Sequence, residues 1–246
     1  MFEYLSAMIL SSARIAPAFF LLPFFNNNVL SSAIRMPVTL LVALALWPHA
    51  PEARPPFDTL LYLGFIAKEV FIGLLLAILI AWPFWILHAV GSIIDNQRGA
   101  TLSSSIDPIS GVDTSELANF FNLFAAAIFL QGGGMTLLLE SYDASYRLCD
   151  PLGDCSPALT PLLSILTKLM FQSLILASPV IAALFMTEAI LGLLSRFAPQ
   201  LNAFSIAMTV KGTVAFLIIM IYFSATLPDT IMKAAFYPDL LNLWFK

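Results

Sequence analysis

Residues 60–89 read LLYLGFIAKEVFIGLLLAILIAWPFWILHA, and this stretch decides what kind of protein the chain is. It exceeds the roughly 20 apolar residues with which a helix crosses the hydrocarbon core of a bilayer. Its only acidic or basic residues besides His88 are the adjacent pair Lys68 and Glu69. A helix satisfies its own backbone hydrogen bonds, which an apolar medium requires. The stretch therefore predicts a long membrane-type helix and an all-α fold.

Other parts of the chain have the same character. Further apolar stretches occur at Leu5–Phe25, Val38–Trp47, Leu117–Leu139, Leu162–Leu194 and Phe204–Leu227. The whole chain is 60% hydrophobic and 11% charged, whereas soluble domains are about 45–50% apolar and about 25% charged. So few charges cannot cover a soluble domain of 246 residues, which indicates contact with membrane lipid or with other apolar subunits. The net charge is −4 and there is no run of basic residues, so nucleic acid is not an expected partner.

The apolar stretches do not resemble simple lipid-bathed spans. The first, fourth and sixth in chain order are each long enough to cross a membrane once. Arg14 lies inside the first, however, and Pro179 and Glu188 lie inside the fifth. Such residues either reach the membrane interface from a helix end or face protein. For the set as a whole we expect several proline-kinked apolar helices whose faces contact other subunits.

Breaks between these helices are expected at three places, namely Pro48–Pro56, Thr101–Glu116 and Ser141–Pro161. None is typical of a long flexible linker, and no internal repeat is apparent, so residues 1–246 are predicted to form one domain. Cys149 and Cys155 lie in the third break, where a disulfide and two free thiols are both open. No metal site, cofactor site or catalytic motif is expected, and the chain is predicted not to be an enzyme.

The most informative polar segment follows the long helix, where residues 91–116 read GSIIDNQRGATLSSSIDPISGVDTSE. Gly99 suits a helix C-terminus, and Arg98 in a last turn complements the helix dipole. Asp113 is expected to cap the next helix, with Glu116 three residues later as in a capping box. The loop between these helix ends could line or close a passage. The alternative is an ordinary surface loop.

A second polar cluster lies at residues 194–204, which read LSRFAPQLNAF. It predicts that an apolar helix ends near Arg196 and that Pro199 interrupts the chain before the next helix. Gln200 and Asn202 can satisfy backbone groups exposed at such a break. The cluster is interpreted as a polar turn between two helices.

Taken together and in order, these motifs resemble the FliR/SctT family of export-gate proteins. The matching motifs are Arg14-x-x-Pro17, Lys68-Glu69-x-x-x-Gly73, Asp95-x-Gln97-x-Gly99, Asp107-Pro108, the glycines at 132–134, and Arg196-x-x-Pro199-Gln200-x-Asn202-x-Phe204. They cover the chain from about Arg14 to Lys211. Residues 93–108 and 195–200 are most similar to the virulence injectisome branch and its SpaR-type members.

The resemblance implies an α-helical subunit packed with R and S subunits (FliP/SctR-like and FliQ/SctS-like) and a U subunit (FlhB/SctU-like). The assembly would be a multi-pass export gate in the bacterial inner membrane, at the base of a type III secretion system. It would pass unfolded effector or needle proteins. The implied plug residues are Ser103, Ser104, Ser105, Asp107, Pro108, Gly111, Asp113 and Glu116. The implied assembly residues are Lys68, Glu69, Asp95, Gln97, Arg98, Arg196, Pro199, Gln200, Asn202 and Lys211.

Two other functions are compatible with the residues. A small-solute or proton-coupled transporter could use Lys68, Glu69, Glu188 or Lys211 as buried ionisable groups. Transporters often show two similar halves, which this chain lacks. A purely structural membrane scaffold is the third possibility.

Overall fold

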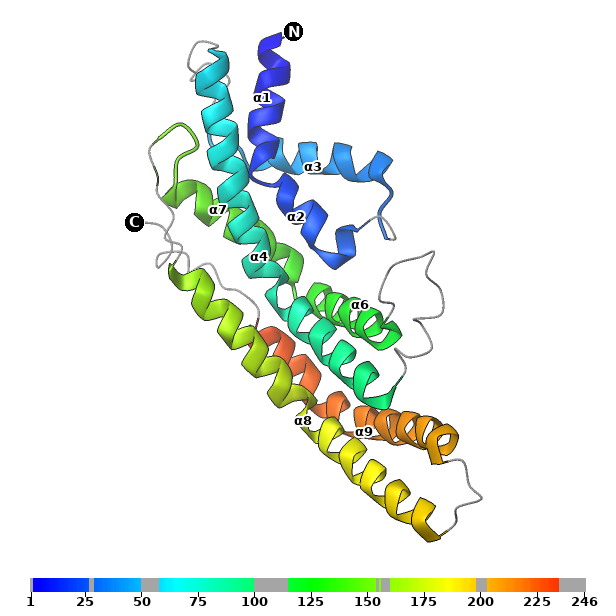
Figure 1. The fold of residues 1–246 in the computed structure, drawn as a ribbon. Coiled ribbons are helices and arrows are strands. Elements are labelled where there is room, and N and C mark those ends of the chain that lie inside the picture. Colours follow the sequence, from blue (N-terminus) through cyan, green and yellow to red (C-terminus); the bar gives the residue numbers. More distant parts are fainter. Residues whose placement is uncertain are drawn as a thin grey trace. The chain divides into compact units, whose positions relative to one another are not determined.

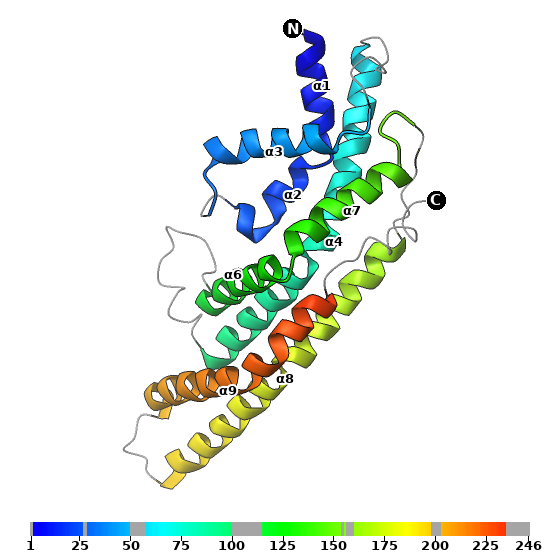
Figure 2. The same ribbon diagram turned by 180° about the vertical axis from the view of Figure 1, so that it is seen from behind.

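The computed structural model describes residues 2–26, 29–49, 58–99, 115–153, 155, 160–197 and 203–234. The part of the chain that is described consists of helices and short turns, as Figures 1 and 2 show, so the predicted all-α fold is confirmed. In chain order the elements are α1 (Phe2–Ala13), α2 (Ala16–Leu21), the 3-10 helix η1 (Pro23–Phe25), α3 (Ser32–Leu46), α4 (Thr59–Arg98), α6 (Glu116–Gln131), α7 (Gly134–Leu148), α8 (Thr160–Phe197) and α9 (Ala203–Ala234). Prolines lie inside several of them, for example Pro37 in α3, Pro83 in α4 and Pro179 in α8.

Within the described ranges, three helices are long and apolar enough to cross a membrane: α4, the Thr167–Phe197 part of α8, and the Ile206–Ser224 part of α9. Helices α6 and α7 would form a fourth span if this bent pair is counted as one. The shorter apolar helix α3 has 15 residues, fewer than the about 20 that a membrane span needs.

The first apolar stretch was expected to be able to span once, and the structure corrects this. Residues 2–25 form α1, α2 and η1 instead of one helix. Pro17 lies in the first turn of α2, and Pro23 is the first residue of η1. Proline lacks a backbone N–H and is tolerated where a helix starts but not in its interior. Each proline therefore begins a new element, and Arg14 lies in the turn between the first two.

The fourth stretch is likewise divided, at the glycines where a kink or a helix end was predicted. Gly133 has φ +84° and precedes α7, a left-handed backbone conformation that glycine adopts without steric cost. A Cβ on Gly134 would overlap the ring of Phe129, so the following turn also requires a glycine.

The predicted break at Ser141–Pro161 is wrong in its first part, because α7 continues to Leu148. The polar residues that suggested a loop lie on a buried helical face. Ser141 Oγ donates to Leu137 O at 2.7 Å, and Ser145 Oγ donates to Tyr142 O at 2.7 Å. Serine hydroxyls can thus be satisfied by the carbonyls of their own helix, so polarity alone did not mark a loop here.

The helices contribute to two compact units. The first contains α1 to α3, α4 up to Trp82, and residues from Phe129 through α7 to Ser164. The second contains α4 from Pro83, α6 up to Ile128, and residues Ile165–Ala234 of α8 and α9. A single functional domain over residues 1–246 stays a prediction.

Candidate functional site

One buried carboxylate, that of Asp95, joins the end of α4 to the start of α6. Its side chain is only 1% exposed. Oδ1 accepts a hydrogen bond from Arg98 Nε at 2.7 Å, and Oδ2 accepts one from Ser115 Oγ, also at 2.7 Å. The backbone N–H of Leu117 donates to the same Oδ2 at 3.1 Å. We call Asp95, Arg98, Ser115 and Leu117 the loop-anchoring cluster, because it holds the two residues that flank segment 99–114.

The end of α4 has the predicted form. Arg98 is its last residue, and Gly99 follows with φ +83° and donates its N–H to Asn96 O at 3.2 Å. Arg98 was expected to complement the helix dipole, and the structure shows that it also pairs with Asp95 one turn earlier. Charge-assisted hydrogen bonds of this kind are about twice as strong as neutral ones, so this helix end is held firmly.

The predicted cap of α6 is wrong. Ser115 caps this helix instead of Asp113: its Oγ accepts from Ala118 N at 3.2 Å. Glu116 is the first helical residue and is exposed, so it is not the third residue of a capping box. Asp95 supplies the negative charge that a helix N-terminus favours. Asp95 lies on α4, so a capping rule that considers only the residues next to the start of α6 cannot identify it.

Close backbone packing between α4 and α6 also supports the loop-anchoring cluster. A Cβ placed on Gly91 would overlap the backbone of Leu117 and Ala118. Only glycine allows α4 and the first turn of α6 to approach this closely at that point. Gly91 lies one helical turn before Asp95. The close packing of α4 against α6 at Gly91 therefore sets the distance between the Asp95 carboxylate and the start of α6.

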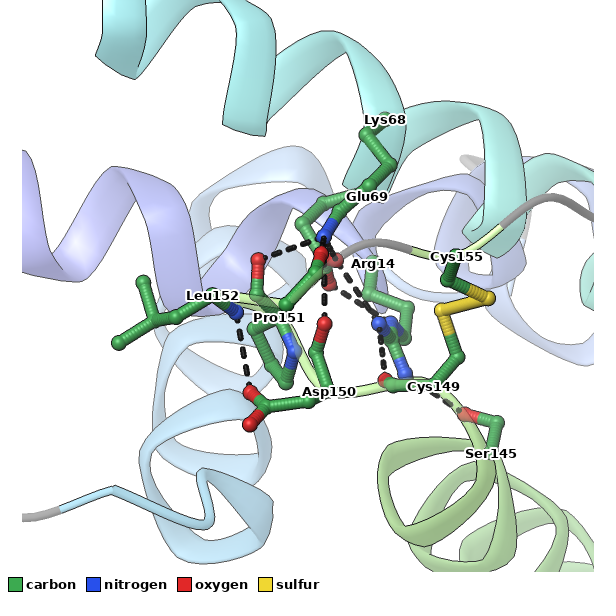
Figure 3. Close-up of a disulfide and its surroundings, with 10 residues drawn as sticks. Arg14, Lys68, Glu69, Ser145, Cys149, Asp150, Pro151, Leu152 and Cys155 are labelled. Atoms are coloured by element: carbon green, nitrogen blue, oxygen red, sulfur yellow. Dashed lines mark hydrogen bonds and ion pairs between the residues drawn. A yellow bond between two sulfur atoms is a disulfide. The ribbon is translucent and has the colours of Figure 1, made fainter.

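A second cluster surrounds Arg14 in the other unit, and it is shown in Figure 3. Arg14 Nε donates to Glu69 Oε2 at 2.7 Å and NH2 donates to Oε1 at 2.8 Å. Both side chains are 0% exposed. Arg14 NH1 also donates to Ser145 Oγ at 3.3 Å, and its guanidinium lies 4.2 Å from the ring centre of Tyr146. These charges in apolar stretches are therefore compensated inside the chain, without a partner subunit.

Lys68 has a different environment from its neighbour Glu69. Its Nζ donates to three backbone carbonyls that follow α7, those of Asp150, Pro151 and Gly153, at 3.2, 2.8 and 2.6 Å. Glu69 Oε1 lies 4.0 Å away. Lys68 and Glu69 are adjacent in the sequence, but each is satisfied by a different part of the fold.

Asp150 carries the clearest electrostatic perturbation outside the apolar helices. Partial burial alone would raise the pKa of this carboxyl group, but its hydrogen bond from Leu152 N–H and its contacts with His49 and Lys68 lower it below the ordinary value. His49 Nε2 lies 2.7 Å from Asp150 Oδ1. The carboxylate is therefore charged at neutral pH and holds the segment before α4 against the end of α7.

The other predicted site residues are spread over the chain. Lys211 Nζ lies 3.0 Å from Glu188 Oε2, with side chains 12% and 59% exposed. Gln97 is half-buried in the last turn of α4, and Arg196 is exposed in the last turn of α8. Outside the described residues lie Ser103, Ser104, Ser105, Asp107, Pro108, Gly111, Asp113, Pro199, Gln200 and Asn202.

Sequence reasoning missed Ser115 and Ser145 as cluster members, and it gave Arg14 no partner. Serine is common at helix starts, so Ser115 directly before an apolar run was a usable signal. Nothing local marked Ser145. Within the described ranges no group of three or more His, Cys, Asp or Glu side chains could hold a metal ion. Both clusters bind and position backbone segments.

Comparison with known proteins gives a consistent family. Residues 5–234 match the family described as "Bacterial export proteins, family 1". The chain is 51% identical over 236 residues to "Surface presentation of antigens protein SpaR" of Salmonella typhimurium, covering 96% of this chain and 90% of that one. It is 31% identical over 217 residues to "Yop proteins translocation protein T" of Yersinia pestis, covering 85% and 82%. It is 26% identical over 196 residues to "Flagellar biosynthetic protein FliR" of Pectobacterium carotovorum, covering 78% and 74%.

Proposed function

Because the chain belongs to the bacterial export proteins of family 1, we propose that it is the T subunit of the export gate in a type III secretion apparatus. The observation that carries this conclusion is the family membership, which extends over nearly the whole chain and includes both clusters. In this role the chain helps to form and close a channel through which unfolded effector or needle proteins cross the bacterial inner membrane. It supplies no energy itself.

Membrane and subunit contacts are needed to cover α8 and α9. Within the chain, 72% of the apolar window of α4 is buried, against 22% for that of α8 and 11% for that of α9. Apolar surface of this extent does not face water. The proposed partners are lipid and the R, S and U subunits, with the assembly residues Arg196 on α8 and Lys211 on α9. Gln97, in the last turn of α4, is a further proposed assembly residue.

The ends of residues 103–116 support a closing role for that segment. Asp95 binds both Arg98 and Ser115, the residues on either side of segment 99–114, which contains most of residues 103–116. Because Gly91 packs against the backbone of α6, the two ends also cannot separate easily. A segment with both ends fixed can fill or leave an opening without displacing the helices that carry it. Opening and closing then require only a modest free-energy difference, about 1–5 kcal/mol.

The transporter hypothesis loses much of its basis in these contacts. It needs ionisable groups at membrane depth that exchange partners with a solute or a proton. Glu69 is bound to Arg14 on both oxygens, and Lys68 is bound to three carbonyls. Lys211 is paired with Glu188.

The proposal is tested by removing residues 109–113 and measuring the ion permeability of cells that carry the assembled apparatus. We expect a complex recovered in normal amount that leaks ions. The matched control replaces residues 109–113 by five Gly and Ser residues, which keeps the segment's length and should leak less. Normal permeability in a fully assembled deletion variant would return the segment to the ordinary-loop alternative. Loss of the complex in both variants would instead assign the segment to assembly.

A further inference from the structure

The most densely bonded part of the first unit is the short connection that begins at the end of α7. Cys149 is bonded to Cys155, with Cα atoms 5.7 Å apart, a separation ordinary for a disulfide. The disulfide therefore closes a loop over residues 149–155, which we call the cystine loop. Figure 3 shows Arg14, from the turn between α1 and α2, and Lys68, from α4, reaching toward this loop.

Backbone carbonyls of the cystine loop satisfy two buried or half-buried cations. An ammonium group has three N–H donors, and those of Lys68 are matched by the carbonyls of Asp150, Pro151 and Gly153. The carbonyl of Cys149 accepts from Arg14 NH2 at 3.0 Å. A chain segment can aim four carbonyls at two cations only if its backbone is held in one tightly curved path.

Among the described residues of the loop, noncovalent contacts also help to hold that path, and His49 Nε2 lies 2.7 Å from Asp150 Oδ1. Two further contacts lie within the loop itself. Gly153 N–H donates to Asp150 O at 3.2 Å, and Leu152 N–H donates to Asp150 Oδ1 at 3.0 Å. Both are local turn contacts. Lys68 itself draws the carbonyl groups together, but three carbonyl dipoles pointing at one place repel each other without a constraint. The link between Cys149 and Cys155 is the constraint that the structure provides.

We propose that Cys149 and Cys155 are a maturation site, at which a thiol–disulfide oxidase uses its own disulfide to oxidise the two cysteines. The resulting cystine loop forms the carbonyl cage for Lys68 and Arg14. This goes beyond the gate function and does not depend on it. Bacterial cytosol keeps thiols reduced, whereas the periplasm is oxidising. The reaction therefore places the connection between α7 and α8 on the periplasmic side of the membrane.

The order of the two exchange steps follows from burial. Cys155 is half-exposed and Cys149 is 1% exposed. The Cys155 thiolate, after losing its proton, attacks one sulfur of the oxidase disulfide, which forms a mixed disulfide and releases the other oxidase sulfur as a thiolate. The Cys149 thiolate then attacks the Cys155 sulfur and displaces the oxidase as a dithiol. Two electrons pass to the oxidase, and the two cysteine protons end on its two sulfurs.

The direct test measures the thiol state of the chain in cells that express the whole apparatus. Cells are quenched in acid and the denatured protein is treated with a maleimide-linked polyethylene glycol, with and without prior reduction. We expect no mass shift without reduction and a double shift after it. In cells lacking the periplasmic oxidase, the doubly shifted fraction without reduction should rise. Two labelled thiols in assembled protein from oxidase-containing cells would overturn the proposal.

The link between the disulfide and the cage is tested by a double-mutant cycle on protease resistance of the detergent-extracted complex. Cys149→Ser/Cys155→Ser should shorten the half-life of the chain, and the shortening should be at least about twofold smaller in a Lys68→Met background, because residues of one network are coupled. If the half-life were shortened equally in both backgrounds, the disulfide would not act through the carbonyl cage around Lys68. The Cys149→Ser/Cys155→Ser variant is also the matched control for the oxidase, since losing the oxidase should not change it further. If these variants do not accumulate, the labelling pattern of the unmodified chain still decides the proposal.

Discussion

Replacement of Glu69 by glutamine isolates the contribution of the buried ion pair to the first unit. Glu69→Gln keeps the size of the side chain and removes its charge. In the native chain both carboxylate oxygens accept from Arg14, at 2.7 and 2.8 Å, and neither side chain is exposed. The variant leaves the Arg14 charge buried without an opposite charge beside it, although the glutamine oxygen, Ser145, the Cys149 carbonyl and the Tyr146 ring can still contact it.

The expected loss follows from leaving a buried charge unpaired. Breaking a buried pair by removing one partner costs about 3–5 kcal/mol, which is roughly two to nearly four powers of ten in the folding equilibrium. The loss is large because the Arg14 charge stays out of water without an opposite charge. It does not follow that the intact ion pair stabilises the chain relative to two apolar side chains. Replacing both partners together, as Arg14→Met/Glu69→Leu, should therefore recover much of the loss.

The assay is resistance of the first unit to limited proteolysis in complexes extracted with mild detergent. Glu140→Gln is the matched control, since Glu140 is exposed on α7 in the same unit. We expect Glu69→Gln to be cleaved far faster than the control, with the double replacement between them. If Glu69→Gln were as resistant as Glu140→Gln, or if the double replacement were cleaved faster than Glu69→Gln, the account of this cluster would be refuted.

Three other perturbations give further tests. Asp95→Asn keeps a hydrogen-bond acceptor but removes the charge that binds Arg98, Ser115 and Leu117; we expect assembled but ion-leaky complexes and a loss of about 1–3 kcal/mol, and unchanged permeability would argue against anchoring. Gly91→Ala should lower the recovery of complex because a Cβ overlaps the backbone of α6, whereas Gly212→Ala, with nothing within 4 Å, should not; equal recovery of the two would contradict the close crossing. The pKa of Asp150 is lowered in the folded chain, so its contribution to stability is present above the unfolded pKa of about 3.9 and is lost as pH falls through the lower folded value. The melting temperatures of Asp150→Asn and native complexes should therefore differ slightly at pH 7 and converge below about pH 4. A difference that grows as the pH falls would contradict this sign.

The main helices could be predicted from the sequence because their signals are local. Hydropathy alone located α4, and Arg98 and Gly99 marked its end, since dipole and left-handed preferences act over one turn. Gly133 likewise marked the break before α7. Pro17 and Pro23, which lack backbone N–H groups, mark the division of the first stretch in the sequence. The apolarity of that stretch, however, predicted a single span.

The two clusters depend on contacts between distant residues, which no local rule contains. Arg14 and Glu69 are 55 positions apart, and Arg14 and Ser145 are 131 apart. Asp95 reaches Ser115 across the segment that separates α4 from α6. Lys68 and Glu69 are adjacent in the sequence, but on a helix their side chains point about 100° apart and meet different neighbours. Composition could thus show that charges were buried, but only the fold shows with what.

The central claim, that this chain lines and closes a protein export channel, is tested most directly by crosslinking to a substrate held in transit. A photo-reactive amino acid is placed at Ser104, and a secreted substrate fused to a rigid domain is expressed so that it stalls in the apparatus. The account predicts a covalent product of chain and substrate that disappears when the substrate lacks its secretion signal. An assembled, secreting apparatus that yields no such product from Ser104 or its neighbours Ser103 and Ser105, while a known channel component does, would contradict it.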